Sequence, residues 1–366
     1  MITNTTVHRI FNFSAGPAIL PLPVLEEAQR DLVSLPGVGM SVLEISHRSK
    51  AFERRLQEAV ADLRALASIP DNYHVLFLHG GASLQFSMVP MNLVPPGGTG
   101  DYIVTGAWSQ KAVKEAKRVG AVHVAASTES EGFARIPRQD EIRLSADGAY
   151  VHVTSNNTIY GTQWRELPEV GDRPLVSDAS SDIFNGPIDV SRHALIYAGA
   201  QKNLGPAGVT LVIIRDDIAR RSPSSLPTML SYATHVDNGS LYNTPPVFAI
   251  YMVGLVAKWL RAEGGLQAVG TQNERKAAKL YAAIDRTDFY RGHAQPDSRS
   301  LMNVTFRLPS EELEKAFVAD ATANGLDGLK GHRSVGGIRA SIYNAFPEEG
   351  VDALTAFMRE FERKHG

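Results

Sequence analysis

The chain has 366 residues, 43% hydrophobic and 21% charged, which is ordinary for a globular protein long enough to form two domains. Its formal net charge of −2 gives no indication of a nucleic-acid or acidic-membrane partner, and the lack of cysteine excludes disulfides, thiolate metal sites and cysteine nucleophiles. The first ten residues lack the pattern of a secretory signal, and the longest apolar run, 247–257, is shorter than the ~18 residues of a spanning helix. We therefore expect a soluble, cytoplasmic protein.

Helical and strand-like patterns alternate along the first 215 residues, after an irregular entry segment at 11–17. Short β-branched or apolar runs predict strands over 73–78, 101–105, 121–126, 150–154, 175–178, 194–198 and 209–214. Apolar residues at spacings of three and four predict helices over 23–33, 52–66, 83–93 and 108–119. This alternation predicts a mostly parallel sheet with helices on both faces.

The last third of the chain has a different order of elements. Thr244-Pro-Pro predicts the start of a long helix, with Thr244 as its cap, and Gly264-Gly265 its end. Helices over 266–285, 311–324 and 351–363 and strands over 301–307 and 338–343 then predict a separate α+β layer. We expect an N-terminal segment (1–15), a large domain (16–262) and a small domain (263–366).

Lys202 is the strongest candidate for a reactive residue. A short apolar strand and small residues precede it, and Gly205, Pro206 and Gly208 follow, so no bulky neighbour shields its amine. One interpretation is a solvated lysine on a turn. The other is a lysine that forms a Schiff base, which needs a desolvated amine or nearby cations because an ordinary amine, with a pKa of about 10.4, is protonated at neutral pH. The setting of the residue favours the second interpretation.

Other strand ends supply the parts of a pyridoxal phosphate (PLP) site. Asp178 ends a strand, where a carboxylate can keep a pyridine nitrogen protonated. Ala82 and Ser83 follow two glycines at a helix start, where free N–H groups suit a phosphate; Trp108 can stack on a ring and Thr158 offers a hydroxyl. Each has a structural alternative, such as a turn aspartate, an empty turn or a packed aromatic. Because an open α/β sheet places its ligand at the carboxyl ends of strands, we expect these residues to surround the lysine.

Two distant segments repeat the triplet His-Arg-Ser. The first contains His47 and Arg48, and the second contains His332 and Arg333. A guanidinium fork beside an imidazole suits a phosphate, and Arg339 can bind a carboxylate through two parallel hydrogen bonds. Although single surface arginines are common, this grouping predicts a substrate with two anionic ends.

These residues together resemble the phosphoserine aminotransferases, PLP enzymes of fold type I in the class V aminotransferase group. The resemblance runs from end to end. It is carried by Phe11-Asn-Phe-Ser-Ala-Gly-Pro17, Ile45-Ser-His-Arg48, Gly80-Gly-Ala-Ser-Leu-Gln-Phe86, Ala198-Gly-Ala-Gln-Lys-Asn203, Tyr242-Asn-Thr-Pro-Pro246 and the segment from Gly331-His-Arg333 to Asn344.

The resemblance implies a large domain with a mostly parallel seven-stranded sheet, a smaller C-terminal α+β domain, PLP as cofactor and no metal. It implies that Lys202 forms the Schiff base and shuttles the α-proton, that Asp178 pairs with the pyridine nitrogen and that Trp108 stacks on the ring. The remaining implied cofactor contacts are Ala82, Ser83, Thr158 and Gln201, with Asn243 and Thr244 from the neighbouring subunit of a homodimer. The implied substrate contacts are His47, Arg48, His332 and Arg333 for the phosphate and Arg339 for the carboxylate.

The implied reaction moves the amino group of L-glutamate to 3-phosphohydroxypyruvate, giving O-phospho-L-serine and 2-oxoglutarate in serine biosynthesis. Bacterial members of the family often also aminate a 4-phosphorylated hydroxy-oxo acid in pyridoxine biosynthesis. Some members carry an arginine directly after the glycine-rich turn where this chain has Ser83. We therefore expect the phosphate site to depend more on the two His-Arg pairs.

Three alternatives are weighed against this interpretation. The lack of cysteine argues against a class V desulfurase, which needs a thiolate to carry sulfur. The two His-Arg pairs argue against an aminotransferase for a small unphosphorylated oxo acid. The presence of both Lys202 and Asp178 argues against a non-catalytic PLP-binding or anion-binding protein.

Overall fold

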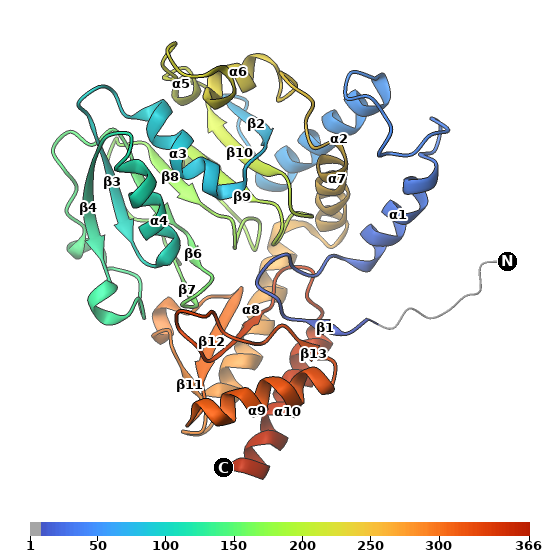
Figure 1. Cartoon of the computed structure of the whole chain (residues 1–366), viewed down its shortest axis with the longest axis vertical. Coiled ribbons are helices and arrows are strands. Elements are labelled where there is room, and N and C mark those ends of the chain that lie inside the picture. Colours follow the sequence, from blue (N-terminus) through green and yellow to red (C-terminus); the bar gives the residue numbers. More distant parts are fainter. Residues whose placement is uncertain (1–8) are drawn as a thin grey trace.

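The computed structural model describes residues 9–366, and its largest element is an open sheet of seven strands (Figure 1). The strand order is β2-β10-β9-β8-β5-β3-β4, and only β10 runs antiparallel to its neighbours. The predicted seven-stranded, mostly parallel sheet is therefore confirmed. The strands are β2 (Tyr73–Leu78), β3 (Thr99–Val104), β4 (Ala121–Ser127), β5 (Val151–Thr154), β8 (Leu175–Asp178), β9 (Leu195–Gly199) and β10 (Thr210–Arg215). Most of the stretch tested for a secretory signal, residues 1–8, lies outside the described residues.

Helices cover both faces of the sheet because successive side chains of each strand point to opposite faces. In β10, Leu211 and Ile213 pack against one group of helices, whereas Val212 and Ile214 pack against the other. The first group is α1 (Leu22–Val33), α2 (Lys50–Ala67) and α7 (Val247–Ala262). The second group is α3 (Gly81–Leu93), α4 (Ala107–Ala116), α5 (Asp216–Ala219) and α6 (Tyr232–Asp237).

Two helix starts show where local signals succeed and fail. The Ser49 hydroxyl caps α2 by accepting a hydrogen bond from Phe52 N at 3.2 Å, as a serine in that position favours. The predicted Thr244 cap is wrong: α7 begins only at Val247, with Pro246 as its cap residue and no side-chain capping bond. Two prolines in succession fix the backbone before the helix, so the threonine is left outside it.

The elements after α7 form the predicted α+β layer, which we call the C-terminal layer (Figure 1). Its buried core includes Leu280, Phe306, Phe317 and Leu354. The first turns of α8 pack instead in the core of the main sheet through Leu266 and other residues, so this helix joins the two cores. The predicted domain boundaries stay a prediction. The layer contains α8 (Gly265–Ile284), α9 (Glu311–Ala323), α10 (Glu348–His365) and the antiparallel strands β11 (Arg291–Gly292), β12 (Asn303–Arg307) and β14 (Ile338–Ser341).

The N-terminal segment crosses to this layer. Strand β1 (Phe11–Asn12) pairs in parallel with β13 (Leu326–Asp327), and Phe13 is fully buried in the core of the C-terminal layer. In residues 9–366 no helix is long and apolar enough to span a membrane. The remaining short elements are β6 (Asn156–Asn157), β7 (Thr162–Gln163) and the 3-10 turns η1 (Glu129–Glu131), η2 (Gln139–Glu141), η3 (Val190–Arg192), η4 (Thr228–Leu230) and η5 (Pro296–Ser298).

Candidate active site

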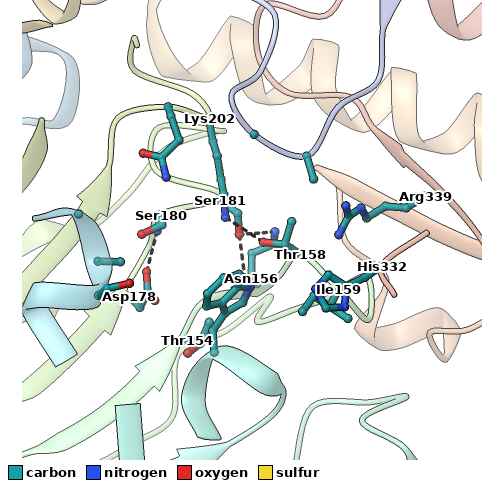
Figure 2. Close-up of a pocket in the computed structure, with 17 residues that line it drawn as sticks. Thr154, Asn156, Thr158, Ile159, Asp178, Ser180, Ser181, Lys202, His332 and Arg339 are labelled. Carbon is teal, nitrogen blue, oxygen red and sulfur yellow. Dashed lines mark hydrogen bonds between the residues drawn. The ribbon is translucent and has the colours of Figure 1, made fainter. Parts of the chain in front are cut away.

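A cavity of about 300 Å³ lies at the carboxyl ends of β5 and β8, beside the turn after β9 and the start of α3 (Figure 2). Its position agrees with the rule that open α/β sheets bind ligands at these ends. Seven predicted cofactor residues line it, together with two predicted substrate residues. They are Ala82, Ser83, Trp108, Thr158, Asp178, Gln201 and Lys202, and His332 and Arg339.

Lys202 presents a desolvated amine to this cavity. Its Nζ donates a hydrogen bond to Thr158 Oγ1 at 3.0 Å and lies 5.8 Å from the centroid of the Trp108 ring. Burial lowers the pKa of Lys202 to about 8, against the opposing effect of Asp178, and Arg339 lowers it further. An amine with this pKa is neutral in a useful fraction of molecules near neutral pH, as a nucleophile requires.

Asp178 lies on the same side of the cavity as Lys202, at the end of β8. Its Oδ1 accepts a hydrogen bond from Ser180 N at 3.0 Å, and the residue is 4% exposed. Burial raises the pKa of Asp178, while hydrogen bonds from Ser180 and the charge of Lys202 oppose that rise. A buried carboxylate is costly without a cation, so a protonated ring nitrogen is a suitable partner for it.

The glycine-rich turn places the start of α3 against the cavity. Gly80 and Gly81 have φ of 87° and 64°, in the left-handed region that favours glycine, and a Cβ on Gly80 would lie 2.5 Å from Leu84 Cβ. The first helical residues, Ala82 and Ser83 among them, line the cavity, and the first N–H groups of a helix have no partner within it. Such a helix N-terminus suits a phosphate.

Arg339 and His332 form the opposite side, and both come from the C-terminal layer (Figure 2). Arg339 lies on β14, and burial lowers its pKa. His332 Nδ1 lies 2.7 Å from Ser334 Oγ and 3.3 Å from Ser334 N, so the ring is held by the serine two residues further on. Burial lowers the pKa of His332, and Arg339 and Arg333 lower it further. The cavity thus has a reactive side on the main sheet and a cationic side on the C-terminal layer.

Several buried polar atoms of the cavity lining lack a hydrogen-bond partner, which indicates that a ligand with polar groups fits the cavity. Trp108 Nε1, Thr154 Oγ1 and Arg339 Nε are buried and have no hydrogen-bond partner within residues 9–366. Buried polar atoms are normally paired, so three such atoms around one cavity indicate a ligand with polar groups. Together with the amine, the carboxylate and the helix N-terminus, this donor set fits a phosphorylated pyridine aldehyde.

The structure adds cavity residues that the sequence analysis did not select. Asn156 donates through Nδ2 to Ser181 Oγ at 2.8 Å, and both line the cavity. Gly16 also lines the cavity and lies beside the lysine: a Cβ there would be in ordinary van der Waals contact with Lys202 Cγ, at 3.5 Å. Asn156 and Ser181 could have been selected from the sequence, because they lie just beyond the ends of β5 and β8. Gly16 belongs to the entry motif that was noted without a role.

Five predicted residues are absent from the cavity lining. His47 and Thr244 line a different hollow of about 510 Å³, and Arg48 and Asn243 are exposed. The two His-Arg pairs therefore do not meet at one cavity within a single chain. Arg333 is exposed near His332 and does not line the cavity.

Comparison with known proteins identifies the class. The sequence model of the class V aminotransferase family matches residues 10–354. The chain therefore belongs to the class V aminotransferases.

Within this class, phosphoserine aminotransferases are similar to the chain over nearly its whole length, which confirms the resemblance drawn from the motifs. The phosphoserine aminotransferase of Desulfatibacillum aliphaticivorans is 57% identical over 98% of this chain and 99% of its own. The solved phosphoserine aminotransferase from Bacillus circulans subsp. alkalophilus has a TM-score of 0.96 and 54% identity, covering 98% of this chain and 99% of its own. The PLP-bound phosphoserine aminotransferase from Trichomonas vaginalis has a TM-score of 0.92 and 40% identity, covering 96% of this chain and 100% of its own.

Proposed function

We propose that this chain transfers the amino group of L-glutamate to 3-phosphohydroxypyruvate, giving O-phospho-L-serine and 2-oxoglutarate in cytoplasmic serine biosynthesis, with PLP as cofactor. The main observation is that Lys202 and Asp178 face Arg339 and His332 across one cavity. This arrangement supports an amine-transfer site on one side and an anion site on the other. The phosphoserine aminotransferases to which the chain is similar support the choice of substrates.

When bound, PLP supplies an aldehyde that exchanges one amine for another and a protonated ring that accepts electrons. Lys202 would hold the aldehyde, Asp178 the ring nitrogen and Trp108 the ring face. The remaining contacts we assign to the cofactor are Ala82, Ser83, Thr158 and Gln201, which all line the cavity.

Lys202 would then move the proton of the reaction. With its amine free, Lys202 Nζ would remove the proton from the α-carbon of glutamate, and in the second half-reaction it would deliver a proton to the α-carbon of the product. Thr158 Oγ1, which accepts a hydrogen bond from this amine, keeps it oriented into the cavity. The low pKa of Lys202 allows one group to serve as base and then as acid.

Arg339 would hold the substrate carboxylate, because its planar fork matches the two oxygens, and its buried Nε has no hydrogen-bond partner within residues 9–366. His332 and Arg333 would receive the substrate phosphate. This division leaves the α-carbon between the two sides of the cavity, near the lysine.

A homodimer would complete the site. His47, Arg48, Asn243 and Thr244 lie away from the cavity of their own chain, on a surface that also exposes apolar side chains such as Leu43, which is 60% exposed. We assign the first two residues to the substrate phosphate and the other two to the cofactor phosphate in the site of a second copy. An exposed apolar surface next to unused polar residues is typical of a subunit interface.

The direct test is an assay of the PLP-loaded protein with L-glutamate and 3-phosphohydroxypyruvate, run beside unphosphorylated hydroxypyruvate. We expect transamination with a strong preference for the phosphorylated oxo acid, and loss of activity in Lys202→Ala with PLP still bound. Equal use of both oxo acids would overturn the assignment of the substrate. Persistent activity in Lys202→Ala would overturn the assignment of the lysine.

A further inference from the structure

Asp182 is a carboxyl group close behind the active site that none of the assignments above uses. It follows Asp178 by four residues, in the turn after β8, and it is partly buried. Together with Ser155 and Gln163 it lines a second cavity, of about 470 Å³, and none of these three residues lines the cavity of Lys202. Asp182 therefore does not meet the substrate, and any part it has in the reaction must pass through other residues.

Both oxygens of the Asp182 carboxyl group have a hydrogen-bond partner. Oδ1 lies 2.5 Å from Ser155 Oγ, and Oδ2 accepts a hydrogen bond from Gln163 Nε2 at 3.1 Å. Gln163 Oε1 in turn accepts from the backbone N of Leu301 at 2.9 Å. Asp182 thus joins the turn after β8 to the residue that ends β5 and, through Gln163, to the C-terminal layer.

Ser155 connects this carboxyl group to the backbone of Asp178. The backbone N of Ser155 donates to Asp178 O at 3.0 Å, and Ser155 Oγ lies 3.0 Å from the same carbonyl oxygen. The serine hydroxyl therefore lies between the side chain of Asp182 and the carbonyl group at the end of β8. Two neighbouring strands are tied together at the point where the Asp178 side chain enters the active-site cavity.

The turn that contains Asp182 also orients the Asp178 carboxylate. Asp178 Oδ1 accepts a hydrogen bond from Ser180 N at 3.0 Å, and Ser180 Oγ accepts from Gly199 N at 3.1 Å (Figure 2). Asp182 N donates to Ala179 O at 3.2 Å, which closes the turn around Ser180. A shift of this turn would therefore move the hydrogen bond that sets the direction of the carboxylate.

The chemistry of the Asp182 carboxyl group suits it to hold Ser155. Burial raises the pKa of Asp182 to about 7, while hydrogen bonds from Ser155 and Gln163 oppose that rise. When the group carries a proton, it can donate to Ser155 Oγ and still accept from Gln163, and the one hydroxyl hydrogen of Ser155 is then free for Asp178 O. An asparagine offers the same donor and acceptor, whereas a leucine of similar size offers neither.

We propose that Asp182 is a positioning residue: its hydrogen bond with Ser155 fixes the end of β8 and holds the Asp178 carboxylate where it can pair with the ring nitrogen of the cofactor. The proposal rests on the proposed function, which gives Asp178 that partner. It does not depend on which oxo acid is used, because Asp182 does not line the cavity that receives the substrate.

The test compares Asp182→Leu, which removes the donor and the acceptor, with Asp182→Asn, which keeps both. Asp189→Ala is the matched control, since Asp189 is exposed, lines the same second cavity, and bonds through its side chain only to Ser191 within residues 9–366. Two measurements use the apoprotein: hydrogen exchange of the peptide that contains Ser155, followed by mass spectrometry, and the dissociation constant of PLP, followed by absorbance. The PLP-loaded enzyme then gives kcat and the inhibition constant of inorganic phosphate.

We expect Asp182→Leu to accelerate exchange at Ser155 and to weaken PLP binding, each by about tenfold, the loss typical of one hydrogen bond to a charged group. Its kcat should fall by about ten- to a hundredfold, because a misplacement of about 1 Å can cost about a hundredfold in rate. Inhibition by phosphate should stay as in the wild type, since the anion side of the cavity is untouched. Asp182→Asn and Asp189→Ala should keep wild-type values in all four measurements.

Two results would overturn the proposal. One is an Asp182→Leu protein with wild-type PLP affinity and kcat, even if it unfolds more easily, because the residue would then serve stability alone. The other is an Asp182→Asn protein as impaired as Asp182→Leu, because the negative charge would then be the cause. If Asp182→Leu does not fold, Ser155→Ala cuts the same link from the other side and should weaken PLP binding equally; wild-type affinity there refutes the proposal.

Failure of the proposed function would look different. The wild type itself would then not transaminate 3-phosphohydroxypyruvate, whereas hydrogen exchange at Ser155 and PLP affinity in the variants would still show whether Asp182 holds the end of β8. A wild type that is active, beside an Asp182→Leu enzyme with the same kcat and PLP affinity, refutes only the role of Asp182.

Discussion

Replacing Asn344 with alanine tests how the C-terminal layer is fixed to the turn that carries the lysine. Asn344 is 3% exposed; its Nδ2 donates to Phe184 O at 2.9 Å, and its Oδ1 accepts from Asn273 Nδ2 at 2.8 Å. Its backbone N donates to Asn203 Oδ1 at 3.1 Å, a bond that alanine keeps. The variant therefore leaves one buried carbonyl and one buried N–H without a partner. Each costs about 1–3 kcal/mol, so the free energy of unfolding should fall by roughly 2–6 kcal/mol.

The same variant should also reduce catalysis, because Asn203 directly follows Lys202 and Asn344 closely follows the strand that carries Arg339. Urea unfolding followed by fluorescence measures the stability, and steady-state kinetics with both substrates measures the effect on the site. Asn238→Ala is the control, since Asn238 is exposed and its side chain bonds only to Thr234 O in the last turn of its own helix. If Asn344→Ala unfolds at the same urea concentration as the control, the buried network does not hold the layer in place.

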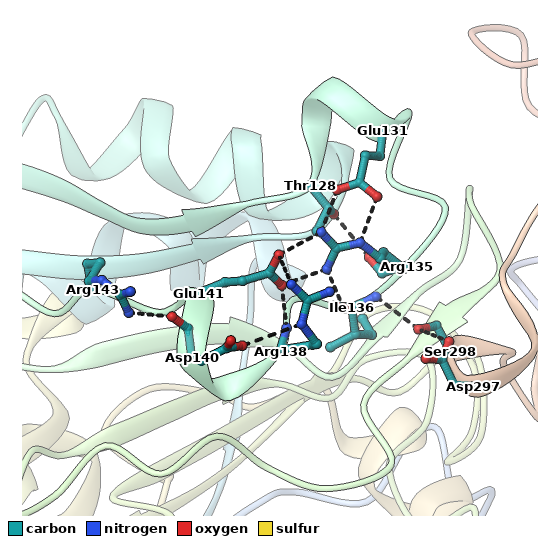
Figure 3. Close-up of polar contacts among 10 residues, drawn as sticks. All are labelled: Thr128, Glu131, Arg135, Ile136, Arg138, Asp140, Glu141, Arg143, Asp297 and Ser298. Atoms are coloured by element: carbon teal, nitrogen blue, oxygen red, sulfur yellow. Dashed lines mark hydrogen bonds and ion pairs between the residues drawn. The ribbon is translucent and has the colours of Figure 1, made fainter.

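Three shorter predictions concern charge and assembly. Arg135 pairs with Glu131 and Glu141 (Figure 3), and its hydrogen bond holds the pKa of Glu141 at about 2, below the usual 4.5. A lowered carboxyl pKa stabilises the fold above pH 4.5 and stops doing so as the pH falls toward 2. The difference in urea unfolding midpoint between the wild type and Arg135→Gln should therefore become smaller as the pH is lowered from about 5 to about 3. A difference that stays constant over this range would contradict the assignment. Because only a neutral amine attacks an aldehyde and the pKa of Lys202 is about 8, PLP uptake by the apoenzyme, followed by absorbance, should accelerate as the pH passes about 8. A rate that stays flat across that range would argue against the assignment. Mixed dimers of Thr244→Glu and Lys202→Ala chains should regain up to one working site, and no recovery would count against a shared site.

The main sheet and its helices could be predicted because their signals are local. Strand β10 alternates between the two faces of the sheet, and α2 shows its apolar stripe and its serine cap within one short segment. The cavity could be anticipated for a similar reason. Lys202, Asp178 and Thr158 follow strand ends, and the carboxyl ends of neighbouring parallel strands share one edge.

Other features depend on contacts between distant segments and left no local pattern. The pairing of β1 with β13 joins two-residue strands from opposite ends of the chain. The hollow that holds His47 together with Thr244 is formed by loops from distant parts of the chain and the start of α7, and loops have no sequence periodicity that would predict it. Repetition of a His-Arg-Ser triplet indicates shared chemistry, but it does not show whether the two copies meet within one chain.

The most direct test of the central claim is to load the protein with PLP, reduce it with borohydride, digest it and locate the modified residue by mass spectrometry. The structure predicts one modified side chain per chain, Lys202, whose amine faces the cavity beside Asp178. A label on another lysine, or none after the cofactor has bound, would contradict the assignment of the reactive amine.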